Sequence, residues 1–337
     1  MNKIGIVGAG AWGTGLAIAL TRAGRRPILW AHEAETVDSI NRQHRNPIFL
    51  AGIELPVSIT ATRELAAVAD AELILLAVPA QHLRAICRRL KPHWPAGVAA
   101  VICAKGIETE SGALMTEIVA DELPKIPAAI LSGPTFAIEV ARGQPTAIAL
   151  ASIDIELARR IVAAIGSSRF RPYASDDPVG VTIGGAVKNV LAIGCGVVEG
   201  RRLGDNARAA LITRGLAEIS RLVVAKGGRA ETCMGLSGLG DLVLTASSTQ
   251  SRNYTLGFGL GEGKRLADLL GARHDVTEGV STAPAVLGLA HRVGVELPVC
   301  AAVAGLLRGD VTVEETVEAL LARPFKSEQV ASAGGPK

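Results

Sequence analysis

Three spaced glycines near the start of the chain are suited to binding a phosphate-bearing dinucleotide. Gly8, Gly10 and Gly13 follow the apolar run Lys3–Val7 and precede a helix-like stretch. The first glycine would permit a tight turn, the second the approach of a pyrophosphate, and the third close packing of helix on strand. The helix N-terminus would present N–H groups and partial positive charge to the phosphates. This predicts a dinucleotide site, with an empty glycine-rich turn as the alternative; Trp12 fits equally a core residue and a wall of the cofactor groove.

Two lysines stand where an ammonium group could act on a substrate. Lys105 comes after the apolar run Val98–Cys103, at a strand end of the kind where open α/β sheets bind ligands. Lys188 lies with Asn189 in an apolar helix-like segment, and helical spacing places the pair Gly184–Gly185 on the faces of these side chains. Each glycine costs about 1 kcal/mol relative to alanine, which bare backbone beside a ligand would explain. The alternative for Lys105 is a solvated surface lysine. The alternative for the glycines and Lys188 is close helix packing with a lysine side chain that reaches solvent. We favour a functional role for both lysines.

Polar residues further along complete a set suited to a small phosphate ester. Asp241 stands at an expected helix start, and Ser251, Arg252 and Asn253 are consecutive. Arginine offers phosphate two parallel hydrogen bonds, and serine and asparagine add others. Taken singly, Asp241 would be a helix cap and the three consecutive residues a polar loop. Glu278 is equally a turn residue or a ligand of cofactor or substrate.

The first half of the chain alternates short apolar runs with helix-like stretches. This alternation predicts an α/β fold with a mostly parallel, doubly wound sheet, whose continuously apolar strands are covered on both faces. The expected strands are Lys3–Val7, Pro27–Trp30, Val57–Thr60, Leu73–Val78, Val98–Cys103, Ala128–Leu131, Thr146–Leu150 and Arg169–Pro172. The helix-like segments between them include Ala11–Ala23, Gln81–Leu90 and Ile155–Ile165.

From about Val179 onward the pattern predicts helices alone. They are Val181–Gly200, Ala207–Lys226, Leu239–Ser247, Leu266–Leu270, Thr282–Val293, Val299–Leu307 and Val313–Leu321. Asp177 and Pro178 have the chemistry of an N-cap and a first helical residue, which marks the boundary. We expect a dinucleotide-binding domain over residues 1–177, an all-α substrate domain over 178–323, and a flexible tail over 324–337.

Composition limits the classes of function. The 337 residues are 49% hydrophobic, enough for two buried cores. A net charge of +3 is too small to indicate nucleic-acid binding, although it suits an anionic substrate. The five cysteines and six histidines show no ligand spacing, so we expect neither a metal site nor a disulfide framework. No apolar stretch approaches the roughly 20 residues of a membrane span, and no signal-peptide pattern opens the chain, so we expect a cytoplasmic protein that inserts into no membrane.

An ordered set of motifs resembles a known family. The motifs are Gly8-Ala9-Gly10-Ala11-Trp12-Gly13-Thr14, Val78-Pro79-Ala80-Gln81, Lys105-Gly106, Ser132-Gly133-Pro134-Thr135-Phe136-Ala137, Lys188-Asn189, Gly204-Asp205-Asn206, Gly238-Leu239-Gly240-Asp241-Leu242, Ser251-Arg252-Asn253 and Glu278-Gly279. Together they resemble the bacterial NAD(P)-dependent glycerol-3-phosphate dehydrogenases. The resemblance implies a Rossmann domain followed by a helical substrate domain, a homodimer, and interconversion of sn-glycerol 3-phosphate and dihydroxyacetone phosphate for glycerophospholipid synthesis.

The resemblance also implies roles for single residues. Lys188 would be the catalytic acid/base. The phosphate-ester substrate would be held by Lys105, Gly133, Thr135, Lys188, Asp241, Ser251, Arg252 and Asn253. Besides the three glycines of the turn, NAD or NADP would contact Ala11, Trp12, His32, Glu33, Phe49, Lys105, Ala137, Arg252, Val276 and Glu278, and no metal would take part.

Two positions depart from the family pattern. Phe49 stands where a tyrosine is usual, so a hydroxyl is absent, and His32 stands where an arginine is common, which weakens a charge contact to a 2′-phosphate. The second expected strand ends near Trp30, so no carboxylate lies at its tip to bind a ribose 2′-OH, and Glu33 would take that part only if the strand ran longer. We therefore expect NADPH to be used at least as well as NADH.

Two other interpretations stay open from the sequence. A related β-hydroxyacid or 6-phosphogluconate-type dehydrogenase would also join a Rossmann domain to a helical domain and could share the Lys-Asn pair. The Gly-Leu-Gly-Asp and Ser-Arg-Asn motifs favour the glycerol phosphate enzyme over it. A nicotinamide-sensing module without catalysis would lack a catalytic group, and none is missing here.

Overall fold

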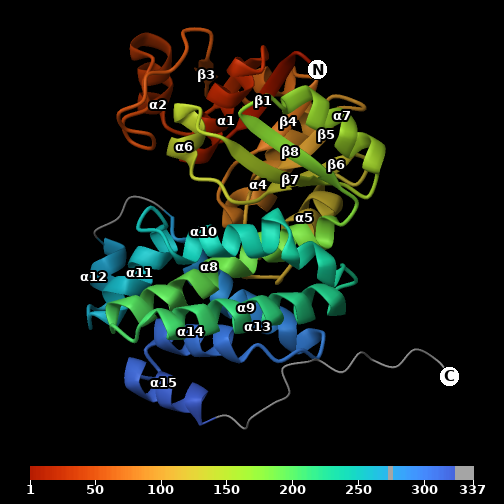
Figure 1. Cartoon of the computed structure of the whole chain (residues 1–337). Helices are drawn as coiled ribbons and strands as arrows, with labels where there is room; N and C mark the ends of the chain where they lie inside the picture. The colour runs from red at the N-terminus through yellow and green to blue at the C-terminus, as the bar shows by residue number, and fades with distance from the viewer. Residues whose placement is uncertain (272–275, 323–337) are drawn as a thin grey trace, which may run out of the picture.

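The computed structural model describes residues 1–271 and 276–322; the expected tail over 324–337 lies outside them. In Figure 1 an α/β half lies above a helical half. The α/β half is built on one eight-stranded sheet of order β3-β2-β1-β4-β5-β6-β7-β8. Its strands are β1 (Lys3–Val7), β2 (Arg26–Trp30), β3 (Thr60–Thr62), β4 (Leu73–Leu76), β5 (Ala99–Ile102), β6 (Ala128–Ser132), β7 (Thr146–Ala151) and β8 (Phe170–Ser175).

All neighbouring strands of the sheet are parallel except β6 and β7. The order reverses between β1 and β4, which is the switch point of a Rossmann fold, and ligands bind there at the carboxyl ends of the strands. The predicted mostly parallel, doubly wound sheet is confirmed.

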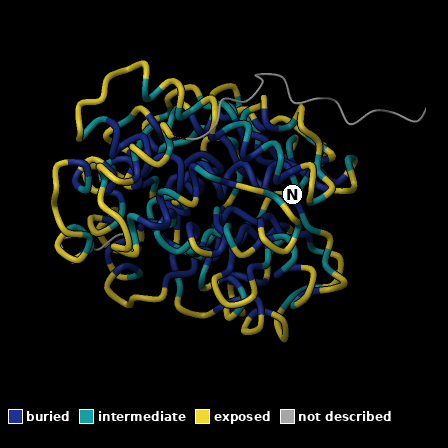
Figure 2. The backbone as a smooth tube through the Cα atoms, turned by 90° about the horizontal axis from the view of Figure 1, so that it is seen from below, coloured by how far each residue is buried: buried dark blue, intermediate teal, exposed yellow. Residues whose placement is uncertain are grey.

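The strands are continuously apolar because helices cover both faces of the sheet. In β4, Leu73 and Leu75 join one core, whereas Ile74 and Leu76 join the core on the opposite face. Successive side chains of a strand point to opposite faces, so a strand buried on both sides has no polar alternation. Figure 2 shows the buried backbone running through the interior. The helices of this half are α1 (Ala11–Arg22), α2 (Ala34–Asp38), α3 (Leu65–Ala69), α4 (Leu83–Leu90), α5 (Met115–Glu122), α6 (Ala137–Arg142) and α7 (Ile155–Ile165).

The second half is organised around α8 (Pro178–Gly200), which packs against α9, α10, α11, α13 and α14. As expected, Asp177 caps α8: its side chain accepts a hydrogen bond from the backbone N of Gly180 at 2.9 Å, and Pro178 is the first helical residue. Within residues 178–271 and 276–322 the regular elements are all helical. The α-helices after α8 are α9 (Asp205–Ala225), α10 (Asp241–Ala246), α11 (Arg252–Gly261), α12 (Leu266–Gly271), α13 (Glu278–Arg292), α14 (Pro298–Arg308) and α15 (Val313–Leu321).

The expectation that no apolar stretch has the length of a membrane span is wrong for α8. Over the described residues this 23-residue helix alone is long and apolar enough to cross a membrane by length and composition. Its most apolar window is buried entirely inside the protein. It is the core helix of the second half, and its apolarity is explained by neighbouring helices on all sides.

Two local expectations are corrected. The third strand is Thr60–Thr62 and not Val57–Thr60, because Val57 is exposed and a turn from Pro56 to Ile59 precedes the strand. The Ser251–Asn253 segment is the start of α11 and not a polar loop. Ser251 is the N-cap and accepts a hydrogen bond from the backbone N of Tyr254 at 3.2 Å.

Candidate active site

A buried carboxylate joins two lysines that lie far apart in the sequence. Lys105, just beyond β5, donates from Nζ to Oδ2 of Asp241 at 2.6 Å, and Lys188 on α8 donates from Nζ to Oδ1 at 2.7 Å. Asp241 is fully buried, and it is the first residue of α10 and not its cap, which is Gly240. The helix-cap interpretation of Asp241 was therefore wrong. The structure brings the three residues into one cluster, which we call the Lys-Asp-Lys cluster.

Burial makes the Lys188 ammonium unusually acidic. Desolvation, with smaller contributions from the charges of Lys105 and Arg252, lowers the pKa of Lys188 to about 8, although the charge of Asp241 opposes the fall. Thr245 accepts a second hydrogen bond from Lys188 Nζ at 2.7 Å. A lysine with a pKa near neutrality is able both to donate and to accept a proton at physiological pH.

Thr245 was not among the residues expected in the site. A signal was present, because Asp241 and Thr245 are four residues apart and lie on one face of α10.

The two glycines before Lys188 are explained by packing. A Cβ on Gly185 would lie 2.2 Å from Ser132 Oγ, and one on Gly184 would lie 2.7 Å from Ser237 O. The helix therefore approaches the end of β6 closely, and close packing is the correct interpretation of the glycines. Lys188 does not reach solvent, however, since it is 7% exposed.

The turn after β6 lies against the Lys-Asp-Lys cluster. The carbonyl oxygen of Gly133 accepts a hydrogen bond from Lys105 Nζ at 2.9 Å, and the hydroxyl of Thr135 donates to the same oxygen at 3.2 Å. Gly133 and Thr135 therefore lie beside Lys105. All three residues are expected to hold the substrate.

A pair of asparagine side chains ties three helices together beside Lys188. Asn253 donates from Nδ2 to Oδ1 of Asn189 at 3.0 Å, and its own Oδ1 accepts from the backbone N of Gly279 at 2.9 Å. Both asparagines are buried, so α8, α11 and α13 meet at this point. Arg252 precedes Asn253 with an exposed side chain.

Glu278, the first residue of α13, reaches across to the α/β half. Its Oε1 accepts a hydrogen bond from the backbone N of Ala80 at 3.1 Å, while its Oε2 is buried without a partner. Burial raises the pKa of Glu278, and the charge of Arg252 opposes the rise. Thr282 Oγ1 is also buried without a partner, and a Cβ on Gly106 would lie 3.6 Å from both atoms. Unpaired buried polar atoms are costly, which marks this corner as one that a ligand would complete.

The glycine turn has the geometry that a dinucleotide requires. Gly8 has a φ of +117°, and a Cβ there would lie 2.5 Å from Ala77 O. A Cβ on Gly13 would lie 1.8 Å from Gly8 O, whereas one on Gly10 would meet nothing within 4 Å, so the middle position is open to a pyrophosphate. The residues present therefore fit the dinucleotide.

Other residues expected to contact the cofactor lie at the starts of α1 and α6 and around Phe49. Ala11 and Ala137 begin α1 and α6, which pack together, and Trp12 packs on the core with a buried Nε1 that has no partner. Phe49 is half-buried, and its backbone N donates to Asn46 Oδ1 at 3.4 Å.

Asn46 ties the segment around Phe49 to the glycine turn. Its Nδ2 donates to Ala9 O at 2.8 Å and to Thr14 Oγ1 at 2.9 Å. Val276, also expected to contact the cofactor, precedes α13, and its side chain is exposed.

The tip of β2 carries no buried carboxylate. The strand ends at Trp30, and His32 and Glu33 follow it with exposed side chains. Glu33 is the N-cap residue of α2 but makes no side-chain capping bond. Among the residues that the structure describes, no group of three metal-ligating side chains is found.

The chain was compared with known proteins. The family model for the N-terminus of NAD-dependent glycerol-3-phosphate dehydrogenase matches residues 3–158, and the model for the C-terminus matches residues 177–318. The glycerol-3-phosphate dehydrogenase of Rhodospirillum rubrum is 56% identical over 329 residues, which are 97% of this chain and 94% of that protein. The one of Paramagnetospirillum magneticum is 66% identical over 255 residues, 76% of this chain and 93% of that protein.

A crystal structure of glycerol-3-phosphate dehydrogenase from Coxiella burnetii is similar with a TM-score of 0.92 and 39% identity, over 96% of this chain and 99% of that one. These matches agree with the ordered motifs and with the Rossmann and helical halves. The chain belongs to the NAD(P)-dependent glycerol-3-phosphate dehydrogenase family.

Proposed function

We propose that this protein reduces dihydroxyacetone phosphate to sn-glycerol 3-phosphate with NADPH or NADH, and catalyses the reverse oxidation. The observation that supports the proposal is the Lys-Asp-Lys cluster, which lies at the carboxyl edge of the sheet together with the glycine turn. The test is to follow NADPH and NADH absorbance separately with dihydroxyacetone phosphate. Oxidation of the reduced cofactor with no ketone present, or no oxidation with dihydroxyacetone phosphate, would contradict the proposal.

In the proposed reaction Lys188 gives its proton to the C2 oxygen of the ketone. A reduced nicotinamide held by the proposed dinucleotide residues would supply the hydride for C2, so that the carbonyl π bond would break and one C–H and one O–H bond would form. Lys188 is left neutral and is protonated again from solvent, whereas in the oxidation it accepts the proton. Lys105 places a second positive charge beside the developing alkoxide, and Asp241 holds both ammonium groups in place.

The remaining site residues are proposed to bind and orient the ligands. Arg252 and Ser251 would hold the substrate phosphate with Asn253, and Gly133 and Thr135 would line the substrate. The residues for the dinucleotide are Gly8, Gly10, Ala11, Trp12, Gly13, His32, Glu33, Phe49, Lys105, Ala137, Arg252, Val276 and Glu278. We assign residues 1–177 to a dinucleotide-binding domain and residues 178–323 to a helical substrate-binding domain, and each domain also contributes residues to the other ligand. We further assign a cytoplasmic homodimer without a metal, and the family resemblance supports these assignments.

Replacing Arg252 with alanine is expected to raise the KM for dihydroxyacetone phosphate strongly. The guanidinium is the group in this region that can form two parallel hydrogen bonds to a phosphate, and a charge-assisted bond is worth about 1.5–3 kcal/mol. Steady-state kinetics on phosphorylated and unphosphorylated dihydroxyacetone separate a role in phosphate binding from a structural or cofactor role. Activity on the unphosphorylated ketone, however poor, should change little, and equal losses on both would indicate a structural or cofactor role.

NADPH is expected to be used at least as well as NADH. No carboxylate stands at the end of β2 to repel a 2′-phosphate, and His32 can donate a hydrogen bond to one, best when protonated. The measurement is kcat/KM for the two cofactors at one pH and one salt concentration. A preference for NADH beyond about tenfold, or about 1.4 kcal/mol, would mean that Glu33 binds the ribose.

A further inference from the structure

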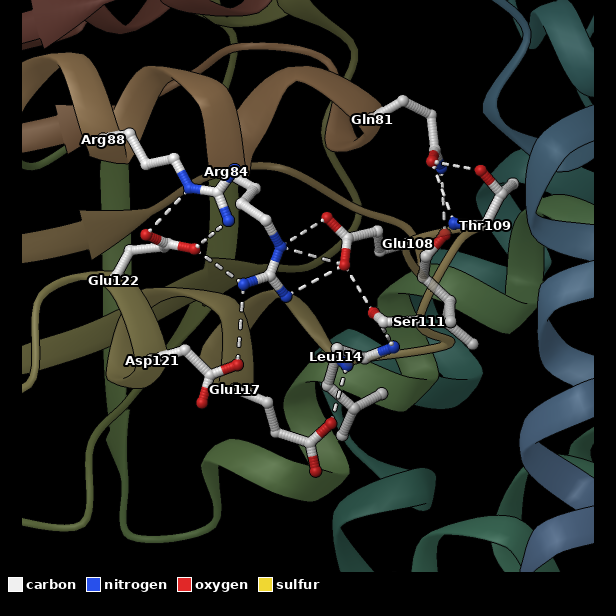
Figure 3. A network of polar contacts seen from close by, with 12 residues as sticks. Gln81, Arg84, Arg88, Glu108, Thr109, Ser111, Leu114, Glu117, Asp121 and Glu122 are labelled. Atoms are coloured by element: carbon white, nitrogen blue, oxygen red, sulfur yellow. Dashed lines mark hydrogen bonds and ion pairs between the residues drawn. The ribbon is translucent and has the colours of Figure 1, made fainter.

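The segment that follows Lys105 is held by a buried ion network. Residues 106–114 connect Lys105 to α5, and we call them the 106–114 loop. Glu108, three residues beyond Lys105, has a side chain that is only 9% exposed. Figure 3 shows its carboxylate between Arg84 of α4 and Ser111 of the loop itself.

The carboxylate of Glu108 is fully engaged. Arg84 donates from Nε to Glu108 Oε1 at 2.9 Å and from Nη2 to Oε2 at 2.9 Å, in the fork geometry that carboxylates favour. Ser111 Oγ donates to the same Oε2. The hydrogen bonds from Arg84 and Ser111 hold the pKa of Glu108 below its usual range, so it stays ionised at neutral pH although it is buried.

Further bonds hold the loop backbone on the same side. Gln81, just before α4, donates from Nε2 to the carbonyl of Ile107 at 2.9 Å and accepts from the backbone N of Thr109 at 3.0 Å. Both the nitrogen and the oxygen of the Gln81 amide are therefore bonded to the loop. Glu108 N also donates to Ala113 O at 3.0 Å, which closes the loop on itself.

The loop is bonded to the helical half as well. Arg292 of α13 donates from Nη2 to the carbonyl of Gly112 at 3.0 Å. Just beyond the loop, Glu117 of α5 pairs with Lys226 at 2.6 Å. Gly112 has a φ of +65°, and a Cβ there would lie 2.2 Å from Arg292 Nη2. The 106–114 loop that follows Lys105 is therefore bonded both to the α/β half and to the helical half, which supplies Lys188 and Asp241.

We propose that Glu108 is a positioning residue for Lys105. Its ion pair with Arg84 fixes the backbone from which the Lys105 side chain reaches Asp241 Oδ2 and Gly133 O. A lysine side chain is long and flexible, so the position of its ammonium depends on a fixed backbone. A displacement of about 1 Å at a reacting centre can cost on the order of 10²-fold in rate. This inference rests on the proposed function, since it gives Lys105 a part in the reaction.

Glu122 supplies a matched control. It is also a glutamate paired with Arg84, with Nη1 to Oε1 at 2.8 Å, and its side chain is 12% exposed, but it belongs to α5 and not to the 106–114 loop. Arg84 and Arg88 hold its pKa low as well. Glu108→Gln and Glu122→Gln therefore remove the same charge from the same network, and they differ in contact with the loop.

The first measurement is steady-state and binding analysis of both variants. We expect similar falls in Tm for the two, but a fall in kcat for dihydroxyacetone phosphate reduction of about tenfold for Glu108→Gln alone. The Kd for NADPH should stay unchanged in Glu122→Gln. Because the Lys105 charge lowers the pKa of Lys188, its displacement should also move the alkaline limb of kcat/KM to higher pH in Glu108→Gln, with Asp241 and Arg252 still in place. Equal losses of kcat in both variants, or an unchanged kcat in Glu108→Gln, would overturn the proposal.

The second measurement does not depend on activity. Lys105 has a side chain that is 16% exposed, so acetylation of its ammonium, quantified by mass spectrometry, should be slow in the wild type. Acetylation should be faster in Glu108→Gln and unchanged in Glu122→Gln. Equal labelling of Lys105 in all three proteins would refute the positioning role. If labelling differs as expected but the wild type does not reduce dihydroxyacetone phosphate, the proposed function fails and the positioning of Lys105 stands.

Discussion

Replacing Lys188 with alanine is expected to lower kcat for dihydroxyacetone phosphate reduction by about 10²-fold or more. This is the scale on which an enzyme loses rate when it loses a positioned acid or an oxyanion-stabilising charge. Lys188 is buried and donates to Asp241 and Thr245, so its removal leaves both groups without its ammonium. The measurement is single-turnover or steady-state kinetics at saturating substrate.

Two observations keep this result interpretable. The Kd for NADPH should be nearly unchanged, since the proposed dinucleotide residues do not include Lys188. Lys188→Met keeps most of the side-chain volume without the charge, so it should show the same loss of kcat with a smaller loss of Tm. Wild-type turnover in either variant would remove Lys188 from the mechanism.

Replacing Asp241 with asparagine is expected to lower kcat/KM by about 10²-fold and to shift its pH dependence. The variant leaves two ammonium groups beside each other without their shared counter-charge. The reduction needs protonated Lys188, so kcat/KM of the wild type for reduction should fall as pH rises through about 8, the pKa of Lys188. The oxidation needs neutral Lys188, so its rate should rise over the same pH range. Asp241 raises the pKa of Lys188, so its removal should move the falling limb of the reduction to lower pH.

The control is Asp268→Asn, which neutralises an aspartate of α12 that pairs with Arg265 and has a side chain 58% exposed. It should keep both the rate and the pH profile of the wild type. A falling limb at unchanged pH in Asp241→Asn would show that Lys188 is not the titrating acid, and a limb at higher pH would contradict the sign of the interaction.

The sheet was predictable where apolar runs are long and buried on both faces. β1, β4 and β5 each lie within or coincide with the expected range. β3 was placed too early because it is a three-residue edge strand with one buried side chain, so its run of residues carries little periodicity. The start of α11 was missed because Ser251, Arg252 and Asn253 are all polar, and a serine N-cap looks like a loop residue until the helix behind it is seen.

The site was predictable as a set of residue types and not as a set of contacts. Lys105, Lys188 and Asp241 stood out singly because each interrupts an apolar context or begins a helix. Their bonds join residues 136 and 53 positions apart, and nothing in local spacing encodes such pairs. For the same reason the ion pair of Arg84 with Glu108 was not foreseen, since each residue alone resembles a charge on a solvated surface.

The central helix α8 has a consequence for synthesis of the chain on the ribosome. Its apolar surface is covered by helices that extend to Arg308 at the end of α14, so about 100 residues must follow it before its last neighbour exists. At a synthesis rate of about 5–20 residues per second, the apolar surface of α8 stays incompletely covered for roughly 5 to 20 s. Chains truncated before α14 should therefore aggregate or depend on chaperones, although they contain every residue of the Lys-Asp-Lys cluster.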